Sequence, residues 1–357
     1  MCVDPRTCVR AVALLVCAAV SAGTLACGGG SRPRQEEASE TPAAPKVLTA
    51  SERAAWHQEC WAHFNARAWE QFRACYADTV ESEQVDSGQP AARGIEAAMA
   101  VNKGFTEAFP DAKGTGELIL VNGAAIVSIY VLNGTHTGSL LAPDGQVIPA
   151  TNRPIGVYLA HHTRADAVGN KVVKEDIYSD TGTMMAQLGL SPTPARPVVT
   201  GAAARPAVVL ASGTPGELSN VDLLRAQIAA YNSRDAKGAA SYNAPDMRYR
   251  DLAMPADQTA AESYEGMQAF FKAFPDAKLA ATSAWGAGSY VVATGRVEGT
   301  NRGPIPAMGV KRPTGKAVSV RYLDITRWEG GKIKEEWIFY DRLAMARQLG
   351  LITRTGP

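Results

Sequence analysis

The six residues Ala-Phe-Pro-Asp-Ala-Lys stand at positions 108–113, and the same six stand again at 273–278. Two further blocks recur in the same order along the chain. They are Gly-Thr-His-Thr-Gly at 134–138 with Gly-Thr-Asn-Arg-Gly at 299–303, and Gln-Leu-Gly-Leu at 187–190 and 348–351. Three recurring blocks in one order indicate that a single folding unit occurs twice in this chain.

The repeat divides the 357 residues into two bodies of ordinary domain length, at 51–190 and 217–353. Residues 191–216 between them are rich in Pro, Ala and Gly and are expected to form a linker. Residues 28–50 are polar and Pro-rich without a hydrophobic period, which predicts a disordered tether.

The first 27 residues have the pattern of a bacterial export signal. Arg6 and Arg10 precede an apolar run at 11–25, which is too short to span a membrane. The run ends in Thr-Leu-Ala-Cys, which resembles a lipobox with Thr24 in place of the usual Leu. We predict lipidation at Cys27 and an exported protein, anchored by lipid to a bacterial membrane on its periplasmic or surface side. The alternative is a plain secretory signal cleaved nearby.

The cysteine count limits the possible disulfides, and the charge balance limits the possible partners. Processing would leave three of the six cysteines, and Cys60 with Cys75 is then the only pair available for a disulfide in an oxidising compartment. Two buried thiols are the alternative. The 36 Lys and Arg residues nearly balance the 35 Asp and Glu residues, so no nucleic-acid partner is indicated.

The order of the hydrophobic patterns predicts an α+β fold in each body. Helical spacing of apolar residues comes first, and segments rich in β-branched residues follow. The helical sets are Trp56, Cys60 and Phe64, and Val221, Leu224, Ile228 and Tyr231; the strand segments are 121–132, 290–297, 318–328 and 333–340. Helices followed by a curved, mostly antiparallel sheet give two tandem cone-shaped domains of the α+β class.

The second body carries five further blocks in a fixed order: Pro-Thr-Gly-Lys at 313–316, Gly-Lys-Ile at 331–333, Trp337, Asp341 and Gln-Leu-Gly at 348–350. Together with Phe-Pro-Asp and Gly-Thr-His, this order resembles the SnoaL-like ester cyclases, or polyketide cyclases, of the nuclear-transport-factor-2-like superfamily. The resemblance covers about four-fifths of the chain. It implies that each domain is a cone enclosing an apolar pocket.

Cyclases of this family use a His and an Asp to remove a proton next to an ester or ketone carbonyl, after which an aldol reaction closes a ring. The resemblance carries the His onto His136 and places Asp324 where many members have an Asp. His136 and Asp324 are therefore the predicted catalytic residues, with no cofactor. The alternatives are a strand-end His136 bonded to backbone and an Asp324 that faces water.

The two copies divide this pair between them. The second copy has Asn301 at the position of His136, and an Asn cannot titrate. The first copy has His161 at the position of Asp324, after a two-residue insertion. The residues predicted to contact a ligand are His161, Asn301, Tyr322, which shares a strand face with Asp324, and Trp337.

Neighbouring strand residues point to opposite faces, so His161 and His162 cannot bind one ion, and no metal site is predicted. Asp180 and Asp341 each precede a closing helix, where an Asp most often caps the helix.

The sequence favours a lipoprotein whose pockets bind a small apolar carbonyl or aromatic ligand, with catalysis residual or absent. One alternative is a genuine ester cyclase or isomerase that uses His136 in the first domain. Another is a non-catalytic interaction module of the cell envelope. Because proteins of this superfamily often pair through their sheet faces, the two domains are expected to pair with each other.

Overall fold

The computed structural model describes residues 47–141, 146–166, 170–192, 194–201 and 205–352. The predicted signal at 1–27 and most of the predicted tether lie outside the described residues. Among the helices of the described part, none is both long and apolar enough to cross a membrane.

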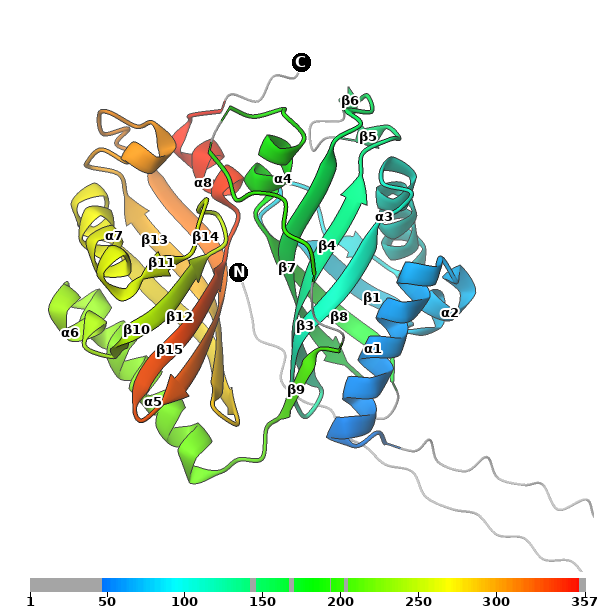
Figure 1. Cartoon of the computed structure of the whole chain (residues 1–357), viewed down its shortest axis with the longest axis horizontal. Coiled ribbons are helices and arrows are strands. Elements are labelled where there is room, and N and C mark those ends of the chain that lie inside the picture. Colours follow the sequence, from blue (N-terminus) through cyan, green and yellow to red (C-terminus); the bar gives the residue numbers. More distant parts are fainter. Residues whose placement is uncertain (1–46, 142–145, 167–169, 193, 202–204, 353–357) are drawn as a thin grey trace, which may run out of the picture. The chain divides into compact units, whose positions relative to one another are not determined.

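The first domain begins with two helices, and a third helix follows the first two strands of its sheet (Figure 1). Its elements in chain order are α1 (Ala50–Ala66), α2 (Trp69–Ala74), β1 (Tyr76–Gln84), β2 (Ala92–Arg93), α3 (Ile95–Ala108), β3 (Lys113–Asn122), β4 (Ala125–Thr135), β5 (Leu140–Leu141), β6 (Val147–Ile148), β7 (Pro154–Ala165), β8 (Val172–Ser179) and α4 (Thr181–Gln187). The short β5 and β6 form a hairpin of their own.

The second domain repeats this order (Figure 1). Its elements are α5 (Pro215–Asn232), α6 (Ala236–Ala240), β10 (Asn243–Asp251), β11 (Gln258–Thr259), α7 (Ala260–Ala273), β12 (Lys278–Ala287), β13 (Tyr290–Thr300), the 3-10 turn Pro306–Met308, β14 (Ala317–Glu329), β15 (Lys332–Phe339) and α8 (Arg342–Leu349). The predicted α+β class with N-terminal helices is confirmed in both halves.

Each sheet has the same strand order. The first runs β2-β1-β8-β7-β4-β3-β9 and the second runs β11-β10-β15-β14-β13-β12. Neighbours are antiparallel except for β1 with β8, β10 with β15, and β3 with β9 (Ala207–Leu210). The predicted linker 191–216 therefore supplies an edge strand, β9, to the first sheet, and its end already belongs to α5.

One strand boundary differs from the sequence expectation. The apolar segment 121–132 was expected as one strand, but it crosses the turn between β3 and β4 at Gly123, whose φ is 56°. Glycine adopts this left-handed conformation without strain, so the turn fits inside a continuous run of β-forming residues.

The repeated sequence blocks form contacts that hold the fold together. Asp111 of Phe-Pro-Asp accepts hydrogen bonds from Thr135 N (2.6 Å) and Oγ1 (2.8 Å) of the Gly-Thr-His block. Gln187 of Gln-Leu-Gly pairs with the backbone of Gly156, accepting from its N–H (2.9 Å) and donating to its carbonyl (3.0 Å). Asp276 with Thr300, and Gln348 with Ser319, make the same contacts in the second domain.

Cys60 on α1 and Cys75 at the end of α2 are joined by a disulfide, with the two sulfur atoms 2.08 Å apart. The cross-link closes a loop with a sequence separation of 15 residues, which stabilises a fold by about 3 kcal/mol on the chain-entropy account. It fixes the two helices against each other beside the inner face of the first sheet.

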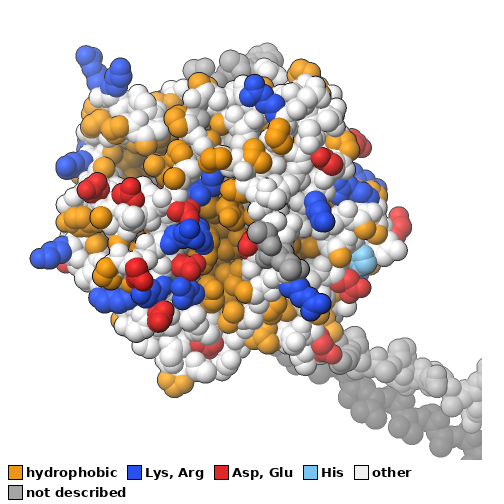
Figure 2. All heavy atoms as spheres, viewed as in Figure 1, with side chains coloured by type: hydrophobic (Ala, Val, Ile, Leu, Met, Phe, Trp, Pro, Cys, Tyr) orange, Lys and Arg blue, Asp and Glu red, His pale blue; other side chains and the backbone are white. Residues whose placement is uncertain are grey.

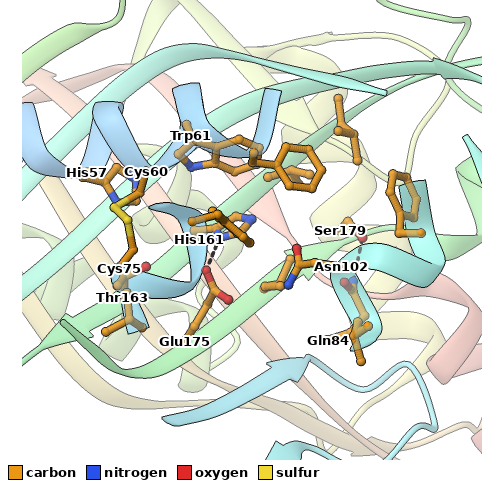
Figure 3. A pocket seen from close by; sticks show the side chains of 18 of the residues that line it. His57, Cys60, Trp61, Cys75, Gln84, Asn102, His161, Thr163, Glu175 and Ser179 are labelled. Carbon is orange, nitrogen blue, oxygen red and sulfur yellow. Dashed lines mark hydrogen bonds and ion pairs between the residues drawn. A yellow bond between two sulfur atoms is a disulfide. The ribbon is translucent and has the colours of Figure 1, made fainter. Parts of the chain in front are cut away.

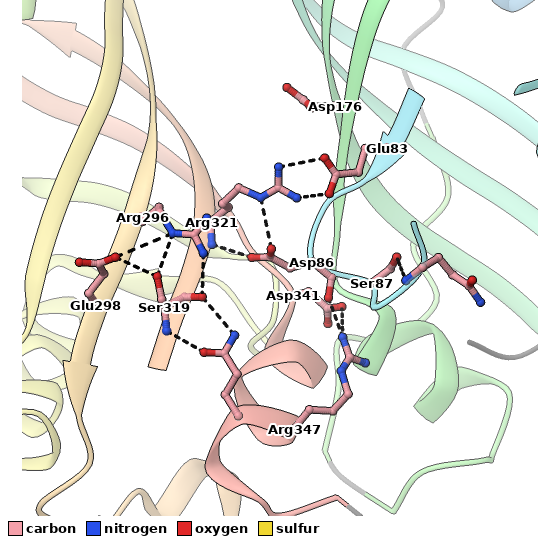
Figure 4. A network of polar contacts seen from close by, with 12 residues as sticks. Glu83, Asp86, Ser87, Asp176, Arg296, Glu298, Ser319, Arg321, Asp341 and Arg347 are labelled. Carbon is pink, nitrogen blue, oxygen red and sulfur yellow. Dashed lines mark hydrogen bonds and ion pairs between the residues drawn. The ribbon is translucent and has the colours of Figure 1, made fainter. Parts of the chain in front are cut away.

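The outer faces of the two sheets pack against each other. Their apolar side chains form one cluster that includes Val127 and Ile129 of β4 with Leu323 and Ile325 of β14. In Figure 2, hydrophobic side chains gather along the middle of the molecule, between surfaces that carry charges of both signs. The Arg321 guanidinium crosses this junction to Glu83 and Asp86, and Asp86 also accepts from Arg321 N at 2.7 Å (Figure 4).

Candidate functional site

A cavity of about 230 Å³ lies in the first domain between helices α1–α3 and the inner face of the sheet. Aromatic side chains form much of its wall: Trp56, Trp61, Phe64, Phe72 and Phe105. Because an apolar cavity of about 150 Å³ takes up benzene, this cavity has room for a ligand the size of two fused six-membered rings.

A buried His–Glu pair forms the polar part of this wall (Figure 3). His161 on β7 and Glu175 on β8 both line the cavity, and His161 Nδ1 lies 2.7 Å from Glu175 Oε1. Only 7% of His161 and 4% of Glu175 is exposed. The indole ring of Trp61 meets the imidazole edge-on, with 5.0 Å between the ring centres.

Glu175 is held in its ionised form. Burial by itself raises the pKa of Glu175, but the charge and hydrogen bond of His161, together with the Ser82 hydroxyl at 3.0 Å, bring that pKa below its usual range. An ionised Glu175 accepts a hydrogen bond from His161 Nδ1, and in the imidazole tautomer that makes this bond the lone pair is on Nε2. Within the described residues Nε2 makes no hydrogen bond, which leaves it available to a ligand.

A second buried pair joins α1 to the sheet. His57 Nε2 lies 2.9 Å from Ser128 Oγ, and His57 also lines the cavity. Burial lowers the pKa of His57 to about 3, and the nearby His161 contributes to the lowering. His57 is therefore neutral at physiological pH and can act as a hydrogen-bond donor but not as a base.

Thr163 lies two residues after His161, on the same face of β7, and also lines the cavity. It is 1% exposed, and its hydroxyl makes no hydrogen bond with any described residue. The corresponding Thr326 of the second domain accepts a hydrogen bond from Trp328 Nε1 at 2.8 Å, and the first domain has Ala165 at the position of Trp328. The smaller side chain of Ala165 thus lacks the N–H donor that Trp328 offers to Thr326 in the second domain.

The sheet register matches the two interiors residue by residue. His161 is opposite Ser128 on β4, and Asp324 is opposite Ala293 on β13. Thr163 is opposite Glu175, and Thr326 is opposite Glu336. The His–Glu pair of the first domain is therefore a pair of carboxyl groups, Asp324 and Glu336, in the second.

Helices α1 and α5 can be aligned through the arginine that follows each of them, Arg67 and Arg234. Arg67 donates to the carbonyls of Pro110 and Ala112, and Arg234 donates to those of Pro275 and Ala277. Counting ten residues back from each arginine matches His57 with Leu224. The buried pair His57–Ser128 thus corresponds to the apolar pair Leu224–Ala293.

In the second domain, Asp324 and Tyr322, which share a strand face, are both buried. Burial raises the pKa of Asp324 to about 7, and its Oδ1 has no hydrogen-bond partner among the described residues. Burial, followed by the charges of Asp324 and Asp251, raises the pKa of Glu336 well above its usual value. The Tyr322 hydroxyl is also buried without a partner in the described chain.

His136 does not line the cavity, in contrast to its predicted catalytic role. It is 0% exposed, its ring stacks on Phe109 with 5.1 Å between ring centres, and its Nδ1 accepts a hydrogen bond from Thr151 N at 3.2 Å. Asn301 has the same role in the second domain, where its Oδ1 accepts a hydrogen bond from Thr314 N at 2.7 Å. Both residues hold the loop that follows, and this explains why His and Asn exchange there.

The predicted ligand contacts of Asn301 and Trp337 are also not supported. Asn301 is 0% exposed, and its amide donates to the carbonyl of Gly303 at 2.8 Å. Trp337 lies in the apolar cluster between the two sheets, with Arg250 over its ring at 4.7 Å. The reason is strand alternation: Glu336 takes the inner face of β15, so Trp337 takes the outer one. Of the four predicted contacts, His161 lines the first cavity and Tyr322 lies inside the second domain.

Sequence reasoning missed Glu175, His57, Ser128 and Thr163. Glu175 had one detectable signal, because aligning the repeats matches it with Glu336, a second Glu in a β-rich segment.

The described residues contain no group of three or more His, Cys, Asp or Glu side chains placed to hold a metal ion. The predicted caps are present: Asp180 accepts from Thr183 N (2.9 Å) and Asp341 from Leu343 N (2.8 Å).

The corresponding apolar pair of the second domain, Leu224–Ala293, suggests a double-variant test of the His57–Ser128 pair. Replacing either residue alone, by His57→Leu or Ser128→Ala, leaves a buried polar atom unpaired and should lower the free energy of unfolding by about 1–3 kcal/mol. The double variant copies Leu224–Ala293 and should be about as stable as the wild type. Urea unfolding of the four proteins gives the coupling between the two sites. Losses that simply add in the double variant would contradict the pairing.

Stability should fall at high pH because of Asp324. Its folded pKa of about 7 is above the unfolded value of about 4, so its contribution is complete below pH 4 and lost as pH rises through 7. From pH 5 to pH 8, the unfolding free energy of the wild type should fall by about 2–3 kcal/mol more than that of Asp324→Asn. Chemical denaturation at both pH values measures this, with the exposed Asp235→Asn as control. Equal pH dependence in both proteins would show that folding does not raise the pKa of Asp324.

Comparison with known proteins agrees with this domain architecture. The model of the family described as SnoaL-like polyketide cyclase matches residues 52–188 and 221–349. A search of curated proteins finds no match. Among solved structures, the chain is similar to AclR, a putative hydroxylase from Streptomyces galilaeus, at 24% identity over 39% of this chain and 85% of that one, with a TM-score of 0.35.

IdmH, a putative polyketide cyclase from Streptomyces antibioticus, is 25% identical over 37% of this chain and 98% of its own, with a TM-score of 0.33. A putative SnoaL-like polyketide cyclase from Jannaschia is 18% identical over 40% of this chain and 99% of its own, with a TM-score of 0.35. Since the family match covers most of the chain in two segments, this protein belongs to the SnoaL-like polyketide cyclase family and carries two tandem copies of its domain.

Proposed function

We propose that the first domain binds a small, mostly apolar carbonyl compound and moves a proton at the carbon next to its carbonyl. The observation that carries this proposal is the buried His161–Glu175 pair on the cavity wall, with His161 Nε2 left unbonded by the described residues. A carboxylate that fixes an imidazole and leaves its second nitrogen toward a substrate is a general acid–base arrangement. It replaces the sequence-based alternative in which His136 is the base.

In the proposed reaction, the C–H bond next to the carbonyl breaks and its proton passes to His161 Nε2. The electron pair of that bond moves into an enolate, and Glu175 stabilises the imidazolium that forms. Attack of the enolate carbon on a second carbonyl would close a ring, and the new alkoxide would take the proton back from His161. Return of the proton to a different carbon would instead give an isomer. Both outcomes use the same first step and need no redox partner.

The negative charge on the enolate oxygen requires a donor in a dry site. Two residues of the cavity wall qualify. The Thr163 hydroxyl has no partner in the described chain, and His57 remains neutral because its pKa is about 3. The surrounding aromatic wall excludes water, which strengthens each of these interactions.

Binding without turnover is the second candidate function, and one observation favours it. The cavity is mainly apolar, so a ligand could be held by burial of its rings alone. The two functions share the ligand class and differ only in whether His161 exchanges a proton.

The test is hydrogen–deuterium exchange at the carbon between the ring and carbonyl of 2-tetralone, a bicyclic ketone of suitable size, followed by proton NMR in D₂O. The wild type should accelerate exchange, and His161→Gln should reduce the enzymatic rate by about 10²–10⁴-fold. His162→Gln is the matched control, because its side chain leaves the strand on the opposite face and does not line the cavity.

The outcomes separate the alternatives. If His161→Gln keeps the wild-type rate, the assignment of the base fails. If 2-tetralone binds and no variant affects its slow exchange, the protein is a binding protein.

We also propose that the protein is exported and lipid-anchored at Cys27. The Cys60–Cys75 disulfide supports export, since disulfides persist mainly in oxidising compartments. Metabolic labelling with an alkyne fatty acid should mark the wild type, and Cys27→Ser should lose the label. Cys17→Ser, within the apolar run of the signal, should keep it. A wild type without label would indicate a plain secretory signal.

A further inference from the structure

The short helix α4 is part of the cavity wall. Its residues Thr181 and Met184 line the cavity, together with Asp180, which caps the helix. At seven residues, α4 is too short to be stable through its own hydrogen bonds. Its position, and with it the shape of this wall, depends on what holds its two ends.

The C-terminal end of α4 is held by the first domain. Gln187 makes the two backbone hydrogen bonds to Gly156 on β7 described above, and its amide also donates to the carbonyl of Arg196 at 3.1 Å. Leu188, which follows the helix, is 1% exposed. These contacts fix the end of the helix that is farther from the Asp180 cap.

The N-terminal end of α4 meets the N-terminal end of α8 from the second domain. Asp180 accepts from Thr183 N in its own helix and from Arg342 N of α8 at 3.0 Å. Asp341 accepts from Leu343 N in its own helix, and both of its carboxylate oxygens lie close to Thr181 Oγ1, at 2.9 and 2.8 Å. Each aspartate therefore caps its own helix and binds the first residue of the other.

The link through Thr181 reaches the cavity directly. The same side chain that lines the cavity of the first domain donates its hydroxyl hydrogen bond to the carboxyl group of Asp341 in the second domain. Asp341 is only 1% exposed, so water does not compete for this hydrogen bond. Capping α8 requires only the bond to Leu343 N, and the contact with Thr181 is additional to it.

We propose that Asp341 of the second domain is a positioning residue for the ligand cavity of the first domain. By holding Thr181, it fixes the start of α4 and keeps this part of the wall closed on a bound ligand. The second domain is thereby a structural component of the first domain's site. This inference rests on the proposed binding function of the cavity.

Three variants of the full chain test it. Asp341→Ser keeps a good helix cap for α8 but is too short to reach Thr181. Asp341→Asn keeps both an acceptor for Thr181 and a cap, and is the conservative rescue. Thr181→Val keeps the side-chain volume and removes the donor. Asp235→Ser is the matched control, because Asp235 caps α6 in the same domain, through Gly238 N at 2.8 Å, and touches neither α4 nor the cavity.

The readouts are the dissociation constant of 2-tetralone, its exchange rate at saturation, and amide hydrogen exchange in α4. Asp341→Ser and Thr181→Val should weaken binding by about 5- to 30-fold, the range expected for the loss of one buried hydrogen bond. In Asp341→Ser, whose altered side chain does not line the cavity, the saturated exchange rate should stay within about twofold of wild type. The α4 amides should exchange faster in both variants. Asp341→Asn should lie near wild type, and Asp235→Ser should change neither quantity.

Unchanged affinity and unchanged α4 protection in Asp341→Ser would overturn the inference. If the wild type does not bind 2-tetralone, the proposed function fails, and α4 protection alone then decides this inference. Faster exchange confined to α4 would support it, and equal exchange in Asp341→Ser and wild type would refute it.

Discussion

Along the central strands β7 and β14 both faces of the sheet are mostly buried, one under the domain's own helices and the other against the second sheet. Because neighbouring strand residues alternate between these faces, residues along the central strands β7 and β14 enter one of two dry environments. A polar side chain that points inward must find a partner or lose hydration without compensation. His161 and His57 have such partners, whereas Thr163 has none in the described chain. An unpaired hydroxyl beside a cavity is therefore informative about a ligand.

The two domains differ mainly at this inner wall. The position of His161 holds Asp324 in the second domain, and the pair His57–Ser128 is replaced there by Leu224–Ala293. In the first domain the inner pair joins His161 to an ionised Glu175. In the second domain burial favours the protonated form of Asp324 below about pH 7. By contrast, the contacts made by Asp111, Gln187 and their counterparts are the same in both copies, so the fold was retained while the interior changed.

The sequence predicted the fold well because its recognisable blocks are the residues that hold the fold together. The same fact explains why it misplaced the site. His136 belongs to a block whose role is to hold a loop, and Asn301 performs that role without a titratable group. Glu175 lies in no such block, and its pairing with His161 depends on the register across a hairpin. Trp337 was assigned to the wrong face because strand parity could not be anchored to an inward residue.

Fusion of two similar domains does not make them equivalent, and the meeting of α4 with α8 shows why. Thr181 and Arg342 occupy the same position, each the first residue of its helix. Asp180 of the first domain reaches the second domain through the backbone N–H of Arg342 and through an ion pair with the Arg342 guanidinium at 3.4 Å. Asp341 reaches the first domain through the Thr181 hydroxyl, which belongs to a cavity-lining side chain. In one direction the link ends on Arg342, which does not line the cavity. In the other it ends on the wall of the site, so a change in the second domain reaches the ligand of the first more directly than the reverse.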